Sequence, residues 1–407
     1  MTCRKSRSLR VGRTVYHLLL AFTMLVFLSS SSSPVQARSS DSLDIKIGQM
    51  LMVGFRGLTV RPSSPIAEDI RNFHLGGVVL FDFDVATKEY GRNIASPMQL
   101  LDLTSGLQES SAIPLFIAVD QEGGKVARLK TRDGFPNNVS HEMARIVSYS
   151  AGQNSRNFTL QQTLYSDDSS KYFIDIMARS LTIVGTNLNF APVLDLNVNP
   201  TNPVIGKLGR SISDDPETVT RHAALMIEAY HAWGVLCAVK HFPGHGSSRD
   251  DSHLGFVDVT DTWSEEELEP YETLISRGLP DMVMTAHIFN SDLDEEWPAT
   301  LSPKVINGLL REQFGFEGVV VTDDMMMKAI ADHYGFEASI RQAVLAGADI
   351  LLFANNTYTY DPAIARNVFN TLKSLVEKGE ISEQRIDLSF QRIMKLKNKL
   401  IARRAQP

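Results

Sequence analysis

Eight short apolar runs, spaced between residues 50 and 353, constrain the fold of this chain more than any other feature. Most of them are continuously apolar rather than alternating, which is typical of strands buried on both faces of a sheet. Amphipathic stretches separate the runs, so they predict parallel crossover units rather than hairpins. Eight such units predict a single α/β domain, a (β/α)8 TIM barrel, with strands at 50–55, 77–81, 114–119, 187–194, 234–239, 282–286, 318–321 and 348–353.

Two of the helices between these runs have clear starting signals. Residues 216–233 follow a Ser-Asp-Asp sequence, and residues 264–277 open with a serine and three glutamates. The stretch 138–171 is rich in serine, asparagine and glutamine, and we interpret it as a polar insertion between the third strand and its helix. We expect one barrel domain over residues 44–403 and no second domain.

The first 37 residues have the layout of a signal peptide. Five basic residues precede an apolar run at 15–28, and serines and an alanine at position 37 follow it. That run is shorter than the roughly 20 residues that cross a bilayer. We therefore expect cleavage near Ala37 and a periplasmic or extracellular protein without stable membrane insertion; an uncleaved membrane anchor is the alternative.

Cysteine content and net charge argue against a disulfide-bonded protein and against a nucleic-acid-binding protein. Cys3 lies in the signal segment and Cys237 lies alone in an apolar run, so we expect no disulfide and a buried, inert Cys237. The net charge is −7, which gives no basic surface for nucleic acid. Nucleic acid is therefore not an expected partner.

Polar residues follow five of the eight apolar runs. In a barrel of this type, catalytic groups gather at the carboxyl ends of the strands. A single strand-end aspartate is more often a helix cap, but charged groups at five strand ends are costly to desolvate and favour a shared site. A loop with three histidines in residues 240–256 adds groups that titrate near neutral pH. The candidates are Asp120, Glu122, Asp195, Lys240, His241, His245, Asp251, His253, His287, Asp323 and Asp324.

The motifs around these residues resemble those of a known enzyme family. The chain is similar to the single-domain β-N-acetylhexosaminidases of glycoside hydrolase family 3, the NagZ type, over about residues 45–400. That family has a (β/α)8 fold, which agrees with the eight apolar runs. The matching motifs are VDQEGGKVARL (119–129), NFAPVLDLN (189–197), GRSIS (209–213), KHFPGHG with DSH (240–253), VMTAH (283–287) and TDDMMMKA (322–329).

The resemblance implies a retaining mechanism through a covalent glycosyl-aspartate. It assigns the nucleophile to Asp323, the general acid/base to His253 and the orientation of His253 to Asp251. Adjacent residues of a strand point to opposite sides, so we expect Asp324 to be structural. Substrate-assisted catalysis by the 2-acetamido group is an alternative.

Five further residues are implied in binding the sugar through their charged donors and acceptors. A structural salt bridge is the alternative role for the two arginines. The five residues are Asp120, Arg128, Arg210, Lys240 and His241.

Two positions depart from the family pattern. Lys125 stands where arginine is usual, and Ser247 stands where aspartate usually follows the GHG sequence. Neither position has an assigned catalytic role. We expect residues 244–248 to form a flexible hinge for the loop that carries Asp251 and His253.

A metal site is the competing use of the histidines and of Asp251, because these side chains are good zinc ligands. The proline and glycine between His241 and His245 argue against a helix that would align them. We expect no metal and no cofactor.

The expected substrate is carbohydrate with terminal β-linked N-acetylglucosamine, from peptidoglycan fragments first and chitin oligosaccharides second. We expect a monomer. Alternatives within the family are a β-glucosidase and an N-acetylglucosaminide phosphorylase, and an alternative of another class is a non-catalytic sugar-binding barrel.

Overall fold

The computed structural model describes residues 42–136 and 160–404, and its central feature is an eight-stranded parallel sheet. Neighbouring strands in the sheet follow chain order, and a parallel bridge between Val321 and Ile350 joins its two ends. The sheet is thus closed, and the predicted (β/α)8 barrel is confirmed. The strands are β1 (Leu51–Gly54), β2 (Gly77–Val79), β5 (Phe116–Val119), β8 (Leu188–Asn189), β9 (Leu236–Phe242), β10 (Met282–Thr285), β11 (Val319–Val321) and β12 (Leu351–Phe353).

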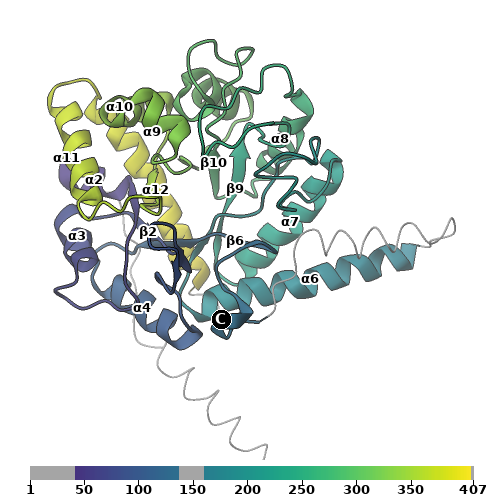
Figure 1. Cartoon of the computed structure of the whole chain (residues 1–407), viewed down its shortest axis with the longest axis horizontal. Helices are drawn as coiled ribbons and strands as arrows, with labels where there is room; N and C mark the ends of the chain where they lie inside the picture. The colour runs from purple at the N-terminus through teal and green to yellow at the C-terminus, as the bar shows by residue number, and fades with distance from the viewer. Residues whose placement is uncertain (1–41, 137–159, 405–407) are drawn as a thin grey trace, which may run out of the picture. The chain divides into compact units, whose positions relative to one another are not determined.

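Helices surround these strands (Figure 1). Two short hairpins follow strands of the barrel: β3 (Phe83–Asp84) with β4 (Glu89–Tyr90), and β6 (Gln121–Gly123) with β7 (Val126–Ala127). A π-helix spans Lys304–Gln313, and 3-10 turns lie at Thr131–Asp133, Glu265–Leu268 and Ala299–Leu301. The α-helices are α2 (Leu43–Gln49), α3 (Pro65–Phe73), α4 (Pro97–Glu109), α6 (Leu160–Ile183), α7 (Pro216–Ala232), α8 (Glu269–Ser276), α9 (Lys328–Tyr334), α10 (Phe336–Ala346), α11 (Ile364–Glu377) and α12 (Glu383–Arg404).

Two strands differ in length from their apolar runs. β8 ends at Asn189, where 187–194 was predicted, because Pro192 has no N–H to donate to a ladder. β9 continues to Phe242, although Lys240 and His241 are polar, because their side chains are buried among charged partners. Two sugar-binding candidates therefore lie within a strand rather than in the loop after it.

The predicted starts of two helices are largely correct. The Asp215 side chain caps α7 by accepting a hydrogen bond from the Thr218 N–H at 2.9 Å, and Pro216 follows it. The stretch 264–277 divides into a 3-10 turn and α8, which begins at Glu269.

Some expectations fall on other parts of the chain. The signal segment 1–37 lies outside the described residues, as does most of the polar insertion, whose end from residue 160 onward belongs to α6. Cys237 is buried, as predicted. Within 42–136 and 160–404, every helix is too short or too polar to cross a membrane.

The last helix, α12, is held against the amino-terminal side of the barrel by buried polar contacts. The Lys397 ammonium donates to Gln49 Oε1 at 2.6 Å and to the Gly76 carbonyl at 2.9 Å. Asp281, which precedes β10, accepts from Lys399 Nζ at 2.7 Å and from Arg403 Nη1 at 3.2 Å. It also accepts from His231 Nε2 on α7 at 2.6 Å, so one carboxylate ties three elements together.

Replacing Asp281 with alanine is expected to lower the free energy of unfolding by about 3 kcal/mol, because this fully buried carboxylate is lost and its partly exposed partners on α7 and α12 lose their shared acceptor. Burial opposes ionisation of Asp281, but His231, Arg403 and Lys399 lower its pKa to about 2. This stabilisation is therefore present at neutral pH and is lost as the pH falls from about 4 towards 2. Urea unfolding at several pH values measures both effects. In the matched control, Asp387→Ala breaks a pair whose carboxylate side chain is 40% exposed, and should cost less than about 1 kcal/mol.

Candidate active site

A cleft of about 930 Å³ lies at the carboxyl ends of the barrel strands. Its walls come from the ends of β5, β9 and β11, from the loop after β9 and from the segment between β8 and α7. The structure brings together in this one cleft all eight residues that the sequence assigned to catalysis or sugar binding, although they are spread over some two hundred positions. They are Asp120, Arg128, Arg210, Lys240, His241, Asp251, His253 and Asp323.

One side of the cleft is a buried network of opposite charges. The Lys240 ammonium lies 2.7 Å from Asp120 Oδ1 and 2.7 Å from Glu122 Oε1. Arg128 Nη2 donates to the other oxygen of Asp120 at 3.1 Å. Burial opposes ionisation of Asp120, yet Lys240 and Arg128 lower its pKa, so the carboxylate is charged and ready to accept from sugar hydroxyls.

Glu122 is the residue of this network whose role sequence reasoning missed. It is fully buried on β6, and both of its oxygens accept from Arg210, at 2.7 and 2.8 Å. Burial opposes its ionisation, but Arg210 and Lys240 hold its pKa well below the ordinary range. The paired arrangement is the structural salt bridge considered as the alternative role for Arg210. No spacing signal could have found it, because Glu122 and Arg210 meet only in the folded barrel.

Asp195, after β8, holds His241 and the loop that follows β9. Its Oδ2 accepts from His241 Nδ1 at 2.6 Å, and its Oδ1 accepts from the backbone N–H groups of His241 at 3.1 Å and His245 at 2.8 Å. Arg210 can only donate, so its Nη2 donates to Nε2 of His241 at 3.2 Å. His241 therefore contributes a fixed ring to the cleft wall, with both ring nitrogens already bonded.

The two adjacent aspartates after β11 have different surroundings. Asp324 Oδ1 accepts from the N–H groups of Ala354 at 2.9 Å and Met326 at 3.1 Å, which makes its carboxyl a structural anchor. Asp323 Oδ1, by contrast, accepts from the Asp324 N–H at 2.8 Å.

Their protonation differs accordingly. Burial raises the pKa of Asp324 to about 7. Burial also opposes ionisation of Asp323, but the nearby His287, His241 and His253 rings outweigh it and lower its pKa to about 2. At neutral pH, Asp323 is therefore the ionised carboxylate of the pair.

Asp251 and His253 form a hydrogen-bonded pair. Asp251 Oδ1 accepts from the His253 N–H and from its Nδ1, both at 2.8 Å, which leaves Nε2 as the outer nitrogen. The hydrogen bond to Asp251 raises the pKa of His253, against the effect of burial and with help from Asp323. The His253 side chain is 61% exposed, so a substrate reaches it from the open side of the cleft.

The expected hinge at 244–248 is wrong. His245, Ser247 and Ser248 are all buried, and the Gly246 N–H donates to Glu267 Oε2 at 2.8 Å. A Cβ atom on Gly246 would lie 1.8 Å from the Leu196 carbonyl oxygen, so only glycine fits this close approach. The segment is a packed base for the loop, and glycine serves packing here rather than bending.

Neither departure from the family pattern lies in the cleft wall. Lys125 is exposed, and its ammonium donates to the Lys207 carbonyl at 2.9 Å. Ser247 is buried beneath the loop beside Glu267. Burial raises the pKa of Glu267 to about 7, opposed by hydrogen bonds from Ser247 and Gly246. The two substitutions thus change the support of the site rather than its lining.

Apolar side chains form the outer rim of the cleft. Leu254 and Tyr358 are 65% and 74% exposed there. Of the three methionines that line the cleft after Asp324, Met326 is half-buried and Met325 and Met327 are buried. This rim was not predicted from the sequence, because its residues come from separate loops. It suits the less polar face of a leaving group.

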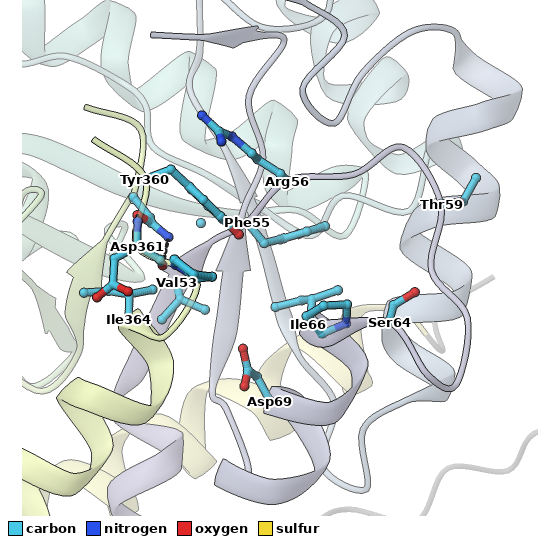
Figure 2. A pocket seen from close by; sticks show the side chains of 14 residues that line it. Val53, Phe55, Arg56, Thr59, Ser64, Ile66, Asp69, Tyr360, Asp361 and Ile364 are labelled. Carbon is cyan, nitrogen blue, oxygen red and sulfur yellow. Dashed lines mark hydrogen bonds between the residues drawn. The ribbon is translucent and has the colours of Figure 1, made fainter. Parts of the chain in front are cut away.

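A second pocket, of about 110 Å³, lies between the end of β1, the start of α3 and the segment before α11. Figure 2 shows the Asp69 carboxylate directed towards it. Burial raises the pKa of Asp69 to about 6. The other carboxylate that lines the pocket, Asp361, already accepts from the Ala363 N–H at 2.8 Å and from Asn367 Nδ2 at 2.9 Å. The chemistry of the chain is therefore concentrated in the large cleft.

No group of three or more His, Cys, Asp or Glu side chains within 42–136 and 160–404 is arranged to hold a metal ion. The histidine nitrogens of the cleft face other partners: His241 faces Asp195, His245 faces two serines and His253 faces Asp251.

Residues 42–396 match the family model described as the glycosyl hydrolase family 3 N terminal domain. A "Beta-hexosaminidase A" of Pseudoalteromonas piscicida is 32% identical over 87% of this chain and 60% of its own length. A "Beta-hexosaminidase" of Tolumonas auensis is 36% identical over 71% of this chain and 78% of its own length.

Solved structures of β-N-acetylglucosaminidases and β-N-acetylhexosaminidases have a similar fold. A family 3 β-N-acetylglucosaminidase from Paenibacillus sp. superposes with a TM-score of 0.77 at 36% identity, over 90% of this chain and 64% of the other. A β-N-acetylhexosaminidase from Beutenbergia cavernae gives 0.74 at 26% identity, over 88% of this chain and 99% of the other. The chain thus spans less than two thirds of the Pseudoalteromonas and Paenibacillus proteins and nearly all of the Beutenbergia one.

Proposed function

The chain belongs to glycoside hydrolase family 3, and we propose that within it this protein is a retaining, exo-acting β-N-acetylhexosaminidase. One observation carries the proposal: an ionised carboxylate, Asp323, shares a cleft with the Asp251–His253 pair, whose histidine has a raised pKa. A nucleophile and a proton donor with separated pKa values are the two groups that retaining glycoside hydrolysis requires.

In the first step, the Asp323 carboxylate attacks the anomeric carbon while His253 Nε2 protonates the departing glycosidic oxygen. Asp251 stabilises the imidazolium before this transfer and fixes Nδ1–H of the neutral ring after it. The sugar remains bonded to Asp323. In the second step, neutral His253 takes a proton from water, and this water displaces Asp323 from the anomeric carbon. Two inversions give net retention.

We propose that the sugar hydroxyls bind the charged side of the cleft, where Asp120 accepts and Arg128 and Lys240 donate. Arg210 and His241 complete this wall and are fixed by Glu122 and Asp195. Donors and acceptors pre-bonded to each other keep their geometry before the sugar arrives, so little ordering is needed on binding.

The proposed glycone is terminal β-linked N-acetylglucosamine. The names of the related proteins, β-hexosaminidase and β-N-acetylglucosaminidase, support it. We propose peptidoglycan fragments as the natural source, with chitin oligosaccharides second. The signal-like segment supports a site of action outside the cytoplasm.

The test compares purified wild-type protein on an aryl β-N-acetylglucosaminide and an aryl β-glucoside, each with and without inorganic phosphate. We expect kcat/KM to favour the N-acetylglucosaminide at least tenfold, as expected where a site hydrogen-bonds a group that the competitor lacks. Free sugar should be the product in both buffers. Preference for the glucoside would indicate a β-glucosidase, and sugar 1-phosphate would indicate a phosphorylase. Binding without turnover would indicate a sugar-binding barrel.

A further inference from the structure

Ser252 is the buried residue in the tip of the loop after β9. Its relative exposure is 3%, whereas Arg249, Asp250, His253, Leu254 and Phe256 are exposed and Asp251 and Gly255 are half-buried. The serine stands directly between the two members of the Asp251–His253 pair. The tip is therefore attached at the position best placed to control both of them.

Two contacts from different elements hold Ser252. Its hydroxyl lies 3.2 Å from Nε2 of His245, in the packed base of the same loop. Its carbonyl accepts from the Ala329 N–H at 3.4 Å, in α9, a few residues after Asp323. Ser252 thus links the base of the loop to the segment that carries the carboxylate of the cleft.

The hydrogen bonds around His245 fix the direction of its bond to Ser252. The Ser248 hydroxyl donates its one proton to the His245 carbonyl at 3.1 Å. Ser248 Oγ must therefore accept from His245 Nδ1, at 2.7 Å, so Nδ1 carries the ring proton. Nε2 is then a bare acceptor, and the Ser252 hydroxyl donates to it.

His245 itself is held rigidly. Its backbone N–H donates to Asp195 Oδ1 at 2.8 Å, and its carbonyl accepts from Asn202 Nδ2 at 2.7 Å. Burial lowers the pKa of His245 to about 4, so the ring stays neutral where His253 titrates. Its acceptor nitrogen therefore remains available to Ser252 throughout that range.

We propose that Ser252 is a positioning residue whose hydroxyl, by donating to His245, holds the Asp251–His253 pair in register with Asp323. This role rests on the proposed function. Asp250, His253 and Leu254 are exposed, and the ring contacts of the tip, between Phe256 and the Phe289 and His333 rings, lie four residues after Ser252. Loss of the hydroxyl bond leaves the backbone contact with Ala329 and loosens the pair. Displacement of a catalytic group by about 1 Å can cost roughly 100-fold in rate.

The experiment measures kcat/KM for aryl β-N-acetylglucosaminides with phenols of increasing pKa. Ser252→Ala should reduce kcat/KM roughly 10- to 100-fold for the most basic phenols. The reduction for a dinitrophenyl glycoside should be less than about threefold, because that leaving group departs without a proton. Ser252→Cys, nearly equal in volume but a weaker donor, should fall between wild type and alanine.

Two further variants serve as controls for the Ser252 variants. His253→Ala gives the leaving-group dependence expected when the acid is absent. Ser276→Ala removes another serine hydroxyl that makes one hydrogen bond, to Thr273 at 2.9 Å on the exposed side of α8, and should match wild type. Thermal unfolding of each variant shows whether any loss of rate comes from loss of fold.

The outcomes separate this role from the proposed function. An equal loss of rate on all leaving groups, or no loss on the basic ones, in a folded Ser252→Ala protein would overturn the positioning role alone. If Ser252→Ala does not fold, the same comparison of leaving groups is made with Ser252→Cys, and the same results would overturn the role. An inactive wild type, or wild-type leaving-group dependence in His253→Ala, would overturn the proposed function itself.

Discussion

Replacing Asp323 with alanine is expected to lower kcat/KM for an aryl β-N-acetylglucosaminide by at least about 10⁴-fold, the scale seen when a covalent nucleophile is removed. Two other carboxylates of the cleft, Asp120 and Asp324, are held by partners of their own. Asp120 is bonded to Lys240 and Arg128, and Asp324 has a raised pKa and accepts from two backbone N–H groups. The covalent step would therefore be lost rather than rerouted.

The stereochemistry of a rescue reaction makes this prediction specific. Azide is small enough to enter the space left by the Asp323 side chain and would attack the anomeric carbon from that side. We expect azide to restore part of the rate and to yield the α-glycosyl azide, identified by NMR. The matched control is Asp44→Ala, a carboxylate outside the cleft that is 43% exposed and paired with Lys373, which should change kcat/KM less than threefold. Retention of more than a tenth of wild-type activity in Asp323→Ala would favour substrate-assisted catalysis instead.

Replacing His253 with alanine is the second large effect. We expect kcat/KM to fall roughly 10²- to 10⁴-fold on a substrate with a basic leaving group, because general acid catalysis contributes about this much. On a dinitrophenyl glycoside, kcat/KM should change little while kcat falls, since hydrolysis of the glycosyl-enzyme then lacks its base. Azide, which needs no base, should restore kcat. A uniform fall in kcat/KM on both substrates would contradict an acid/base role.

The pH dependence of the wild type follows from the same pair. The first step requires protonated His253, so kcat/KM falls at high pH as this group loses its proton. Because the hydrogen bond to Asp251 raises the pKa of His253 above 6.5, the alkaline limb should lie above that value. Asp251→Asn removes the negative partner, so the limb should move to lower pH. A limb that stays in place would show that another group controls it.

The fold could be predicted because strands buried on both faces leave a continuous apolar signal. The limits of that signal appear at β8 and β9. The apolar run 187–194 predicts a longer strand than β8, which ends at Asn189 before Pro192. The polar residues Lys240 and His241 were predicted to follow their strand, but they lie within β9. Both side chains are tolerated there because Asp120 pairs with the Lys240 ammonium and Asp195 accepts from the His241 ring, and these partners meet only in the folded barrel.

The site was recognisable from motifs, but its support was not. The TDD and DSH motifs are typical of family 3 glycoside hydrolases, and they contain Asp323, Asp251 and His253. By contrast, Glu122 matters through Arg210, which lies 88 positions away, and Ser252 matters through a histidine ring that is aligned only after the loop folds. The base at 244–248 was misread as a hinge because glycines permit both bending and close packing, and only the neighbouring Leu196 carbonyl decides between them.

The anchoring of α12 has a consequence for how the protein is made. Lys397 donates a hydrogen bond to Gln49, which lies 348 positions earlier in the chain. Asp281 pairs with Lys399 and Arg403, which are synthesised more than a hundred residues after it. During synthesis, Gln49 Oε1 lacks the Lys397 ammonium, and Asp281 has His231 and Cys237 but not its two α12 partners, until nearly the whole described chain has left the ribosome. Contacts between residues this far apart in sequence form late in folding. The last turns of α12 are therefore a part of the barrel domain that its polar groups require, and not an addition to a finished fold.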